Sequence, residues 1–390
     1  MNGWLGLMAT GVLVLTISGA ALSDSSLPGV GARVRAQISA GEVAGAVTLV
    51  TDPKGVLHLE AEGLADREAG TPLKTDSIFW IASMSKPITA TAVLMLQDEG
   101  KLSVEDPIGK YLPELAHLKT ADGVEHTVTI RQLLTHTSGM GEISSDEAKA
   151  SPTLAVAIPR YATKPLQFVP GSKWKYCQSS INTAARIVEV VSGKSFPEFL
   201  EQRLFRPLGM KDTTFYLSAE QLKRLSKTYA RTPDGKLVEA TNPILYGKSP
   251  TDRDRFPAAN GGLFSTATDY ALFARMILNQ GTLNGKQFLK PASVALMTSV
   301  QTGSLETGFT PGNGWGLGWC VVRTPQGVSG MLSSGTFGHG GAHGTQAWID
   351  PVRKLAYVLM VQRSNFPNSD ASDLRREFQQ AVVGDLRLGK

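Results

Sequence analysis

The segment I-A-S-M-S-K-P-I-T-A, residues 81–90, places two serines and one lysine in an apolar stretch. Residues three positions apart on a helix lie on the same face, so the side chains of Ser83 and Lys86 can touch. A serine hydroxyl becomes a nucleophile when a nearby base takes its proton. Free backbone N–H groups at a helix N-terminus also favour negative charge that develops there. The spacing therefore predicts a helix that begins near Ser83, with Ser83 as a candidate nucleophile and Lys86 as its proton partner.

A Ser-x-x-Lys match is a weak signal on its own, and polar residues that simply open a helix give the same pattern. A second match, S-K-W-K at residues 172–175, follows a Pro-Gly pair and is expected to be a loop. For Lys86 to accept a proton near neutral pH, its pKa must fall. Burial against Phe79, Trp80 and the following apolar helix would lower it.

The elements around this segment predict one sheet built from the two ends of the chain. A hairpin is expected from residues 44–50 and 56–61, around the turn D-P-K-G, and the C-terminal part returns to strands before a closing helix near 370–383. The expected C-terminal strands are 316–322, 345–350 and 355–361. The expected helices before them include 28–38, 88–96, 181–191 and 268–278.

This order predicts an α/β (α+β) fold, in which an antiparallel sheet from both termini is flanked by helices and a mostly helical lobe is inserted into it. We expect residues 24–390 to form a single catalytic domain. Its α/β lobe would comprise about 27–95 and 305–390, and its helical lobe about 96–304.

The N-terminus has the pattern of a signal peptide. Leu5–Ile17 is an apolar run broken only by small residues, and Ala21 and Ser23 are small residues of the kind that signal peptidases prefer. No charged residue occurs before Asp24, and a run of this length could also remain as a membrane anchor. We expect residues 1–23 to be a signal peptide and the protein to be exported, periplasmic or secreted. It would contact the membrane only if this segment stays uncleaved.

Charge and cysteine content exclude several classes of protein. The 39 basic and 34 acidic residues of the 390-residue chain are scattered, without a basic block, so we expect no nucleic-acid partner. Two cysteines, Cys177 and Cys320, cannot form a disulfide framework, and unpaired core residues are the favoured interpretation.

Other segments accompany the Ser-x-x-Lys pair. They are I-R-Q-L-L-T-H-T-S-G-M at 130–140, P-G-S-K-W-K-Y-C-Q at 170–178, L-F-R-P-L-G-M-K-D-T-T-F at 204–215, G-G-L-F-S-T-A-T-D-Y-A at 261–271, G-W-G-L-G-W at 314–319 and F-G-H-G-G-A-H-G-T at 337–345. Together they resemble the serine β-lactamase and penicillin-binding protein superfamily, in particular its class C β-lactamase-like branch with DD-peptidases and family VIII carboxylesterases. The resemblance covers nearly the whole chain after residue 23 and implies a β-lactamase/transpeptidase-like fold.

The resemblance also implies roles for single residues. Ser83 would be the acylated nucleophile, Lys86 its proton partner and Tyr176 a second base that passes the proton to the leaving group. A phenol does so only if neighbouring cations lower its pKa, and Lys86 and His339 are the expected cations. Without the resemblance, Tyr176 could equally be an aromatic residue packed beside Trp174.

The third motif is expected to line the substrate. His339 stands where the family often has a lysine, and Gly340 and Gly341 follow it. Gly341 would let the substrate lie close against the strand. The backbone N–H groups of Ser83 and Ala342 would form the oxyanion hole.

Gln178 departs from the family pattern, which usually has asparagine two residues after the tyrosine. Glutamine offers the same donor and acceptor one methylene further out, so the hydrogen-bond geometry must shift. In β-lactamase-like members the asparagine helps to hold the substrate amide. The replacement therefore argues against amide or lactam recognition more than against ester cleavage.

The leading functional prediction is an exported serine hydrolase that cleaves small carboxylic esters through an acyl-enzyme. Alternatives are a β-lactamase or D-alanyl-D-alanine carboxypeptidase, and a non-catalytic ligand-binding protein. The expected partner is thus a small ester, lactam or D-amino-acid peptide, without a cofactor. His339 and His343 lie in a glycine-rich strand segment, so no metal site is expected, and His136 is expected to order a loop. The primary base and the oligomeric state stay open.

Overall fold

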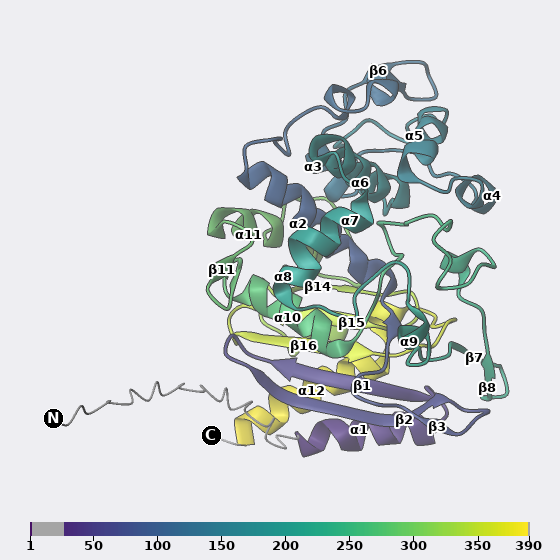
Figure 1. Ribbon diagram of the computed structural model, residues 1–390, viewed down its shortest axis with the longest axis vertical. Helices are drawn as coiled ribbons and strands as arrows, with labels where there is room; N and C mark the ends of the chain where they lie inside the picture. The colour runs from purple at the N-terminus through teal and green to yellow at the C-terminus, as the bar shows by residue number, and fades with distance from the viewer. Residues whose placement is uncertain (2–26, 389–390) are drawn as a thin grey trace.

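An eight-stranded antiparallel sheet lies at the centre of the protein (Figure 1). Our computed structural model describes residue 1 and residues 27–388, so the predicted signal peptide lies, apart from Met1, outside the described residues. The strand order is β12-β13-β14-β15-β16-β1-β2-β3. The strands are β1 (Gly45–Thr51), β2 (Val56–Asp66), β3 (Thr71–Pro72), β12 (Asn313–Trp315), β13 (Cys320–Val322), β14 (Phe337–Gly340), β15 (Gln346–Asp350) and β16 (Leu355–Met360).

The two ends of the chain meet in the middle of this sheet. Strand β1 pairs with β16 in antiparallel register, with Val47 opposite Met360 and Thr51 opposite Ala356. Residues about three hundred positions apart are thereby hydrogen-bonded neighbours. The prediction of one antiparallel sheet built from both termini is confirmed.

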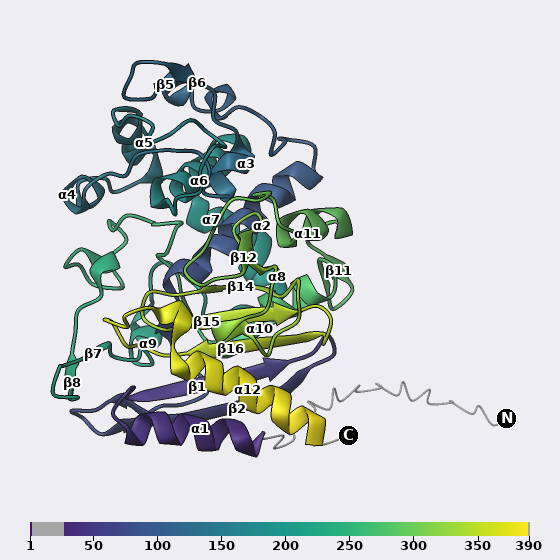
Figure 2. The ribbon, with the colours of Figure 1, turned by 180° about the vertical axis from the view of Figure 1, so that it is seen from behind.

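Helices cover both faces of the sheet, and alternate residues of a central strand contact helices on opposite faces. Tyr357 and Leu359 of β16 face α1 (Pro28–Ser39) and α12 (Asp373–Leu388), which pack against each other on one face (Figure 2). The intervening residues face the opposite side, which α10 (Ala267–Leu278) covers. Successive side chains of a strand point to opposite faces, so a strand covered on both sides is apolar throughout.

A second group of helices lies above the sheet in Figure 1, with α2 (Ser85–Asp98) embedded among them. Every residue of α2 from Ser85 to Leu96 is buried, and α2 packs against α6 (Gln178–Ser192). Helix α6 ends at Gly193, whose left-handed backbone (φ 69°) is the usual glycine stop. The remaining helices are α3 (Ile130–Leu134), α4 (Ser145–Lys149), α5 (Leu154–Ala162), α7 (Phe196–Leu200), α8 (Arg206–Leu208), α9 (Ala219–Leu222) and α11 (Pro291–Thr298).

Short two-stranded ribbons complete the structure. They are β4 (Phe79–Trp80) with β9 (Phe264–Ser265), β5 (Leu118–Lys119) with β6 (Glu125–His126), β7 (Tyr229–Arg231) with β8 (Leu237–Glu239), and β10 (Thr282–Leu283) with β11 (Lys286–Gln287). The predicted strand at 316–322 is wrong in its first half. Trp315 pairs with Cys320, so residues 316–319 form the turn between β12 and β13.

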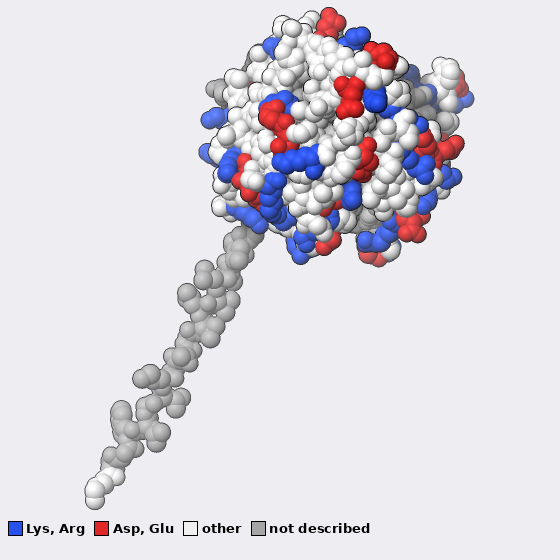
Figure 3. Space-filling view, turned by 90° about the horizontal axis from the view of Figure 1, so that it is seen from above, with Lys and Arg blue, Asp and Glu red and all other residues white. Residues whose placement is uncertain are grey.

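The division into two lobes stays a prediction. Helix α10 belongs by position to the segment 96–304 but packs on the sheet. Cys177 and Cys320 are both free and buried. Within residues 27–388, no helix is long and apolar enough to cross a membrane. Figure 3 shows basic and acidic side chains interspersed on the face seen from above.

Candidate active site

Ser83 lies at the point where the chain enters α2. A single 3₁₀ turn, Ala82–Met84, precedes the helix and continues directly into it. Ala82 has a left-handed backbone (φ 46°), a strained conformation for a residue with a Cβ. The hydroxyl of Ser85 donates to the Ala82 carbonyl at 2.7 Å and so holds this turn. Ser83 itself stays half-buried, so its hydroxyl is positioned by a rigid turn and is still accessible.

Lys86 contacts Ser83 as the spacing predicts. Its Nζ lies 3.0 Å from the Oγ of Ser83 and 2.7 Å from the carbonyl oxygen of Asn260. The Lys86 side chain has no exposed surface. Burial lowers its pKa to about 7, against smaller opposing effects of Glu142, Cys177 and Asp370. A lysine with this pKa is largely neutral just above neutral pH and can accept a proton from Ser83.

Tyr176 meets His339 across the site. The Tyr176 hydroxyl lies 3.3 Å from Nε2 of His339, and Nδ1 of the same ring lies 2.7 Å from the Gly340 carbonyl oxygen. A carbonyl oxygen only accepts, so Nδ1 carries the proton and Nε2 accepts from the phenol. Burial, reinforced by Lys86, lowers the pKa of His339 to about 3. The prediction that His339 supplies a cation is therefore wrong: the ring is neutral.

The pKa of Tyr176 moves in the direction opposite to the prediction. Burial raises it well above its usual value, and a hydrogen bond with Ser83 only partly opposes this. Lys86 is nevertheless close, with Nζ 4.5 Å from the centre of the Tyr176 ring. The phenol therefore keeps its proton near neutral pH and can act as a hydrogen-bond donor or proton relay, not as a resident phenolate.

Aromatic rings hold Tyr176 in place. The rings with centroids 4.4 to 6.2 Å from that of Tyr176 belong to His136, Trp174, Phe309, Trp315 and His339. The nearest of them, His136, accepts the backbone N–H of Cys177 on its Nδ1 at 3.1 Å. The prediction that His136 orders a loop by hydrogen bonding is confirmed, and the ordered loop is the one that carries Tyr176.

Gln178 begins α6 and is bound by two groups that the sequence did not indicate. Its Oε1 accepts from Nδ2 of Asn260 at 2.9 Å. Its backbone N–H donates to the carboxylate of Glu142, which also binds the N–H of Ser179 at 3.0 Å. The Glu142 carboxylate thus caps the positive end of α6. Asn260 joins the two halves of the site, since its carbonyl binds Lys86 and its side chain binds Gln178.

The glycines after His339 are required by close contacts within the chain. A Cβ at Gly341 would lie 2.1 Å from Oγ1 of Thr345 and 2.7 Å from the Ile81 carbonyl oxygen. A Cβ at Gly340 would lie 1.7 Å from Oδ1 of Asp370. Gly341 thus packs against the turn that precedes Ser83, and Ala342 follows it directly in the chain. That the N–H groups of Ser83 and Ala342 form an oxyanion hole stays a prediction.

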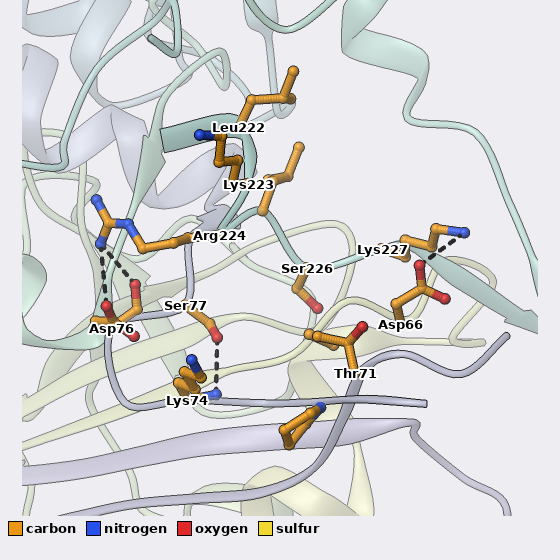
Figure 4. A pocket seen from close by; sticks show the side chains of 13 residues that line it. Asp66, Thr71, Lys74, Asp76, Ser77, Leu222, Lys223, Arg224, Ser226 and Lys227 are labelled. Atoms are coloured by element: carbon orange, nitrogen blue, oxygen red, sulfur yellow. Dashed lines mark hydrogen bonds and ion pairs between the residues drawn. The ribbon is translucent and has the colours of Figure 1, made fainter. Parts of the chain in front are cut away.

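A separate pocket of about 410 Å³ lies beside the segment 222–227 (Figure 4). Four of its charged side chains form two pairs: Lys227 lies 3.2 Å from Asp66, and Arg224 lies 3.8 Å from Asp76. None of the candidate catalytic residues lines it. In residues 27–388 no group of three or more His, Cys, Asp or Glu side chains is placed to hold a metal ion.

Comparison with known proteins gives a consistent result. The family model described as Beta-lactamase matches residues 30–382. Esterase EstB of Burkholderia gladioli is 31% identical over 81% of this chain and 85% of its own length. Penicillin-binding protein 4 of Amycolatopsis lactamdurans is 34% identical over 85% of this chain and 84% of its own.

The fold is shared with solved structures. The structure titled "EstCE1, a hydrolase with promiscuous acyltransferase activity" superposes with a TM-score of 0.80 at 24% identity, over 93% of this chain and all of the other. A penicillin-binding protein homologue from Caulobacter crescentus gives a TM-score of 0.76 at 20% identity, over 92% and 97% of the two chains. These likenesses establish the overall fold that the sequence motifs implied.

Proposed function

Because the chain belongs to the β-lactamase family of serine hydrolases, we propose that it is a carboxylesterase that hydrolyses small esters through an acyl-enzyme on Ser83. The observation that carries the ester preference is the 2.9 Å hydrogen bond between Gln178 Oε1 and Asn260 Nδ2. This hydrogen bond occupies the side-chain oxygen of Gln178. The family resemblance implies that the residue at this position helps to hold a substrate amide. An ester has no N–H and does not need that acceptor.

Acylation follows from the contacts of Ser83 and Lys86. Lys86 Nζ donates to the Asn260 carbonyl and lies 3.0 Å from Ser83 Oγ, so that the neutral amine would accept the Ser83 proton on its lone pair. As Ser83 Oγ bonds to the ester carbonyl carbon, its proton passes to Lys86. The carbonyl oxygen becomes an oxyanion, which the N–H groups of Ser83 and Ala342 would bind.

Breakdown of the tetrahedral intermediate requires a proton for the departing alkoxide. The Tyr176 hydroxyl would give its proton to the leaving oxygen and take one from the Lys86 ammonium, which returns both groups to their starting states. This relay suits a phenol whose pKa is raised, because Tyr176 never has to persist as an anion. Water then attacks the acyl-enzyme with Lys86 again as base and releases the acid.

The proposal is tested by assaying p-nitrophenyl butyrate, nitrocefin and a D-Ala-D-Ala peptide with wild type, Ser83→Ala and Gln178→Asn. We expect the wild type to turn over the ester with an acyl adduct on Ser83, and Ser83→Ala to lose turnover. Ser172→Ala, in the second Ser-x-x-Lys match, is the matched control and should behave as wild type. Absence of both the adduct and ester turnover in folded wild type would refute the esterase.

Gln178→Asn separates specificity from catalysis. The asparagine side chain is one methylene shorter and should no longer reach Asn260. We expect the variant to gain activity on nitrocefin and to keep its ester turnover. If the gain is absent and ester turnover falls with it, Gln178 is needed for catalysis itself and the assigned role is wrong.

A β-lactamase or D-alanyl-D-alanine peptidase is the second candidate. The 34% identity to a protein named penicillin-binding protein 4 favours it. Nitrocefin or peptide turnover that exceeds ester turnover in the wild type, and that is lost in Ser83→Ala, would place it first. A folded protein that neither a fluorophosphonate nor a penicillin labels would instead indicate a non-catalytic ligand-binding homologue.

We also propose that the protein is exported. The apolar run Leu5–Ile17 and the small residues Ala21 and Ser23 support this. N-terminal sequencing of the protein recovered outside the cytoplasm should give Asp24 as its first residue. Recovery of the intact N-terminus from the cytoplasmic fraction alone would contradict export.

A further inference from the structure

The carboxylate of Asp370 lies against the strand that carries the third motif. Its Oδ1 occupies the place where a side chain at Gly340 would begin, 1.7 Å from the position of a Cβ there. It accepts a hydrogen bond from Nε2 of Gln346 at 3.2 Å, and Gln346 is the strand partner of Gly340. Asp370 is only partly buried. The Asp370 carboxylate, which comes from another segment, thus fills the space that a side chain at position 340 would occupy.

The segment that holds Asp370 also borders Tyr176. Two residues earlier, Nδ2 of Asn368 donates to the Phe309 carbonyl at 2.8 Å, and the Phe309 ring lies 4.9 Å from the Tyr176 ring. From His339 on β14 to Ala342 just beyond its end, the chain runs from the Tyr176 contact to the proposed oxyanion amide. Because Tyr176 would protonate the leaving group, Gly340 and the carboxylate above it lie on the leaving-group side.

The charge of Asp370 reaches the catalytic groups. It raises the pKa of both Lys86 and Tyr176, which places the carboxylate within electrostatic range of the two. Arg375, a cation that acts on Asp370, is fully buried, with its guanidinium 3.8 Å from the Trp348 ring. Its guanidinium donates to the Asp370 backbone carbonyl and to the Ser329 hydroxyl. Burial raises the pKa of Asp370, while Arg375, Gln346 and Lys86 favour the ionised form.

The other ionisable groups around the site offer a substrate anion little attraction. His339 and His136 are neutral because burial lowers the pKa of each ring. Lys86 is committed to Ser83 and the Asn260 carbonyl, and Glu142 at the start of α6 adds a second negative charge. A carboxylate on the leaving group would therefore approach Asp370 without a free cation among these groups to compensate.

We propose that Asp370 is a specificity-determining residue, which disfavours substrates with a carboxylate on the leaving group and so directs the enzyme to neutral esters. The inference rests on the proposed esterase function and names its substrate class. β-Lactams and D-Ala-D-Ala peptides carry a carboxylate near the bond that breaks, so the same carboxylate of Asp370 disfavours both.

The test compares two esters that differ in one charge. They are the butyrate ester of para-hydroxybenzoic acid and the butyrate ester of its methyl ester, assayed at low salt and about pH 8, where an ordinary carboxyl is ionised. The measured quantity is the ratio of kcat/KM for the neutral ester to that for the acid. We expect Asp370→Asn to lower this ratio about tenfold, the effect of one like charge at close range, with little change for the neutral ester. Asp373→Asn is the control, since Asp373 is exposed and pairs with Arg376 at 2.7 Å.

Wild type gives an independent readout, because added salt screens the repulsion and should lower its ratio toward that of the variant. This measurement holds even if Asp370→Asn fails to fold. The inference is overturned if the wild-type ratio does not respond to salt, or if folded Asp370→Asn keeps the wild-type ratio while the neutral ester is hydrolysed. A wild type that hydrolyses neither ester removes the proposed function and this inference with it.

Discussion

The Nζ of Lys86 lies 3.0 Å from the Oγ of Ser83, and this pair is enclosed so completely that the lysine has no exposed surface. Burial disfavours the ammonium form of Lys86, so that the neutral amine is available to accept a proton near neutral pH, as our proposal requires. The question left open by the sequence, whether Lys86 or Tyr176 is the primary base, is answered in our proposal by the opposite directions of their pKa shifts.

Lys86→Met should lower kcat/KM for p-nitrophenyl butyrate by about 10²- to 10⁴-fold, the usual contribution of a general base. Methionine fills similar space, so the fold should be retained. Lys175→Met is the matched control, since Lys175 is exposed and belongs to the second Ser-x-x-Lys match. An unchanged kcat/KM in folded Lys86→Met would exclude the lysine as base.

The pH dependence of kcat/KM should follow the protonation of Lys86. Its pKa in the folded protein is about 7, and only the neutral amine accepts a proton from Ser83. Activity should therefore be present above about pH 7 and fall as the pH drops through that value. Neutral His339 should contribute no second limb in this range. A profile that rises only near the ordinary tyrosine pKa would indicate Tyr176 as the base instead.

Stability should depend on pH in the same direction. Unfolding returns Lys86 to its ordinary pKa of 10.5, so between about 7 and 10.5 the unfolded chain binds a proton that the folded chain does not. The Lys86 contribution to the free energy of unfolding therefore rises with pH in this window. Denaturant titrations of wild type and Lys86→Met should diverge accordingly, with the variant relatively more stable below about pH 7. If the free energies of unfolding of wild type and Lys86→Met change with pH in parallel, the lowered pKa of Lys86 is contradicted.

Tyr176→Phe should act through the leaving group. The ring keeps its aromatic neighbours, but the hydroxyl that relays the proton is lost. We expect kcat/KM to fall about 10²-fold or more for an alkyl butyrate, whose alkoxide needs a proton, and much less for the p-nitrophenyl ester. Tyr111→Phe, whose hydroxyl binds Asp106 away from the site, is the control. Equal losses on both esters would point to a structural role for Tyr176.

Gly341→Ala should damage both stability and activity. The new methyl would lie 2.1 Å from Thr345 Oγ1 and 2.7 Å from the Ile81 carbonyl, so the turn before Ser83 must move. Overpacking of this kind costs about 1–3 kcal/mol. Gly55→Ala is the matched control because nothing lies within 4 Å of its added Cβ. The comparison uses urea unfolding and ester turnover, and a variant equal to Gly55→Ala in both would show that the contact with Ile81 is unimportant.

The sequence predicts the local features of this protein well. The hairpin around D-P-K-G, the apolar helix after Lys86 and the helix expected at 181–191 all follow from short-range patterns, and each is confirmed. The contact between Ser83 and Lys86 is of the same kind, because helical geometry fixes it within one turn.

Contacts between distant segments were not predictable in this way. Asn260 and Asp370 belong to no motif, yet each reaches the site through a hydrogen bond or a close approach set by the packing of whole elements. The charge of His339 was predicted wrongly for a related reason. The residue type indicates an ionisable ring, but the tertiary structure buries it, and burial decides its charge.

The pairing of β1 with β16 bears on how the chain is made. The sheet cannot close until residues 355–360 have left the ribosome, because β16 is synthesised about three hundred residues after its partner β1. Strand β1 therefore waits for its partner while about three hundred further residues are made, and long-range pairing of this kind forms slowly. The proposed export would require the chain to be threaded through a channel before it folds, and late closure of the sheet is compatible with that order of events.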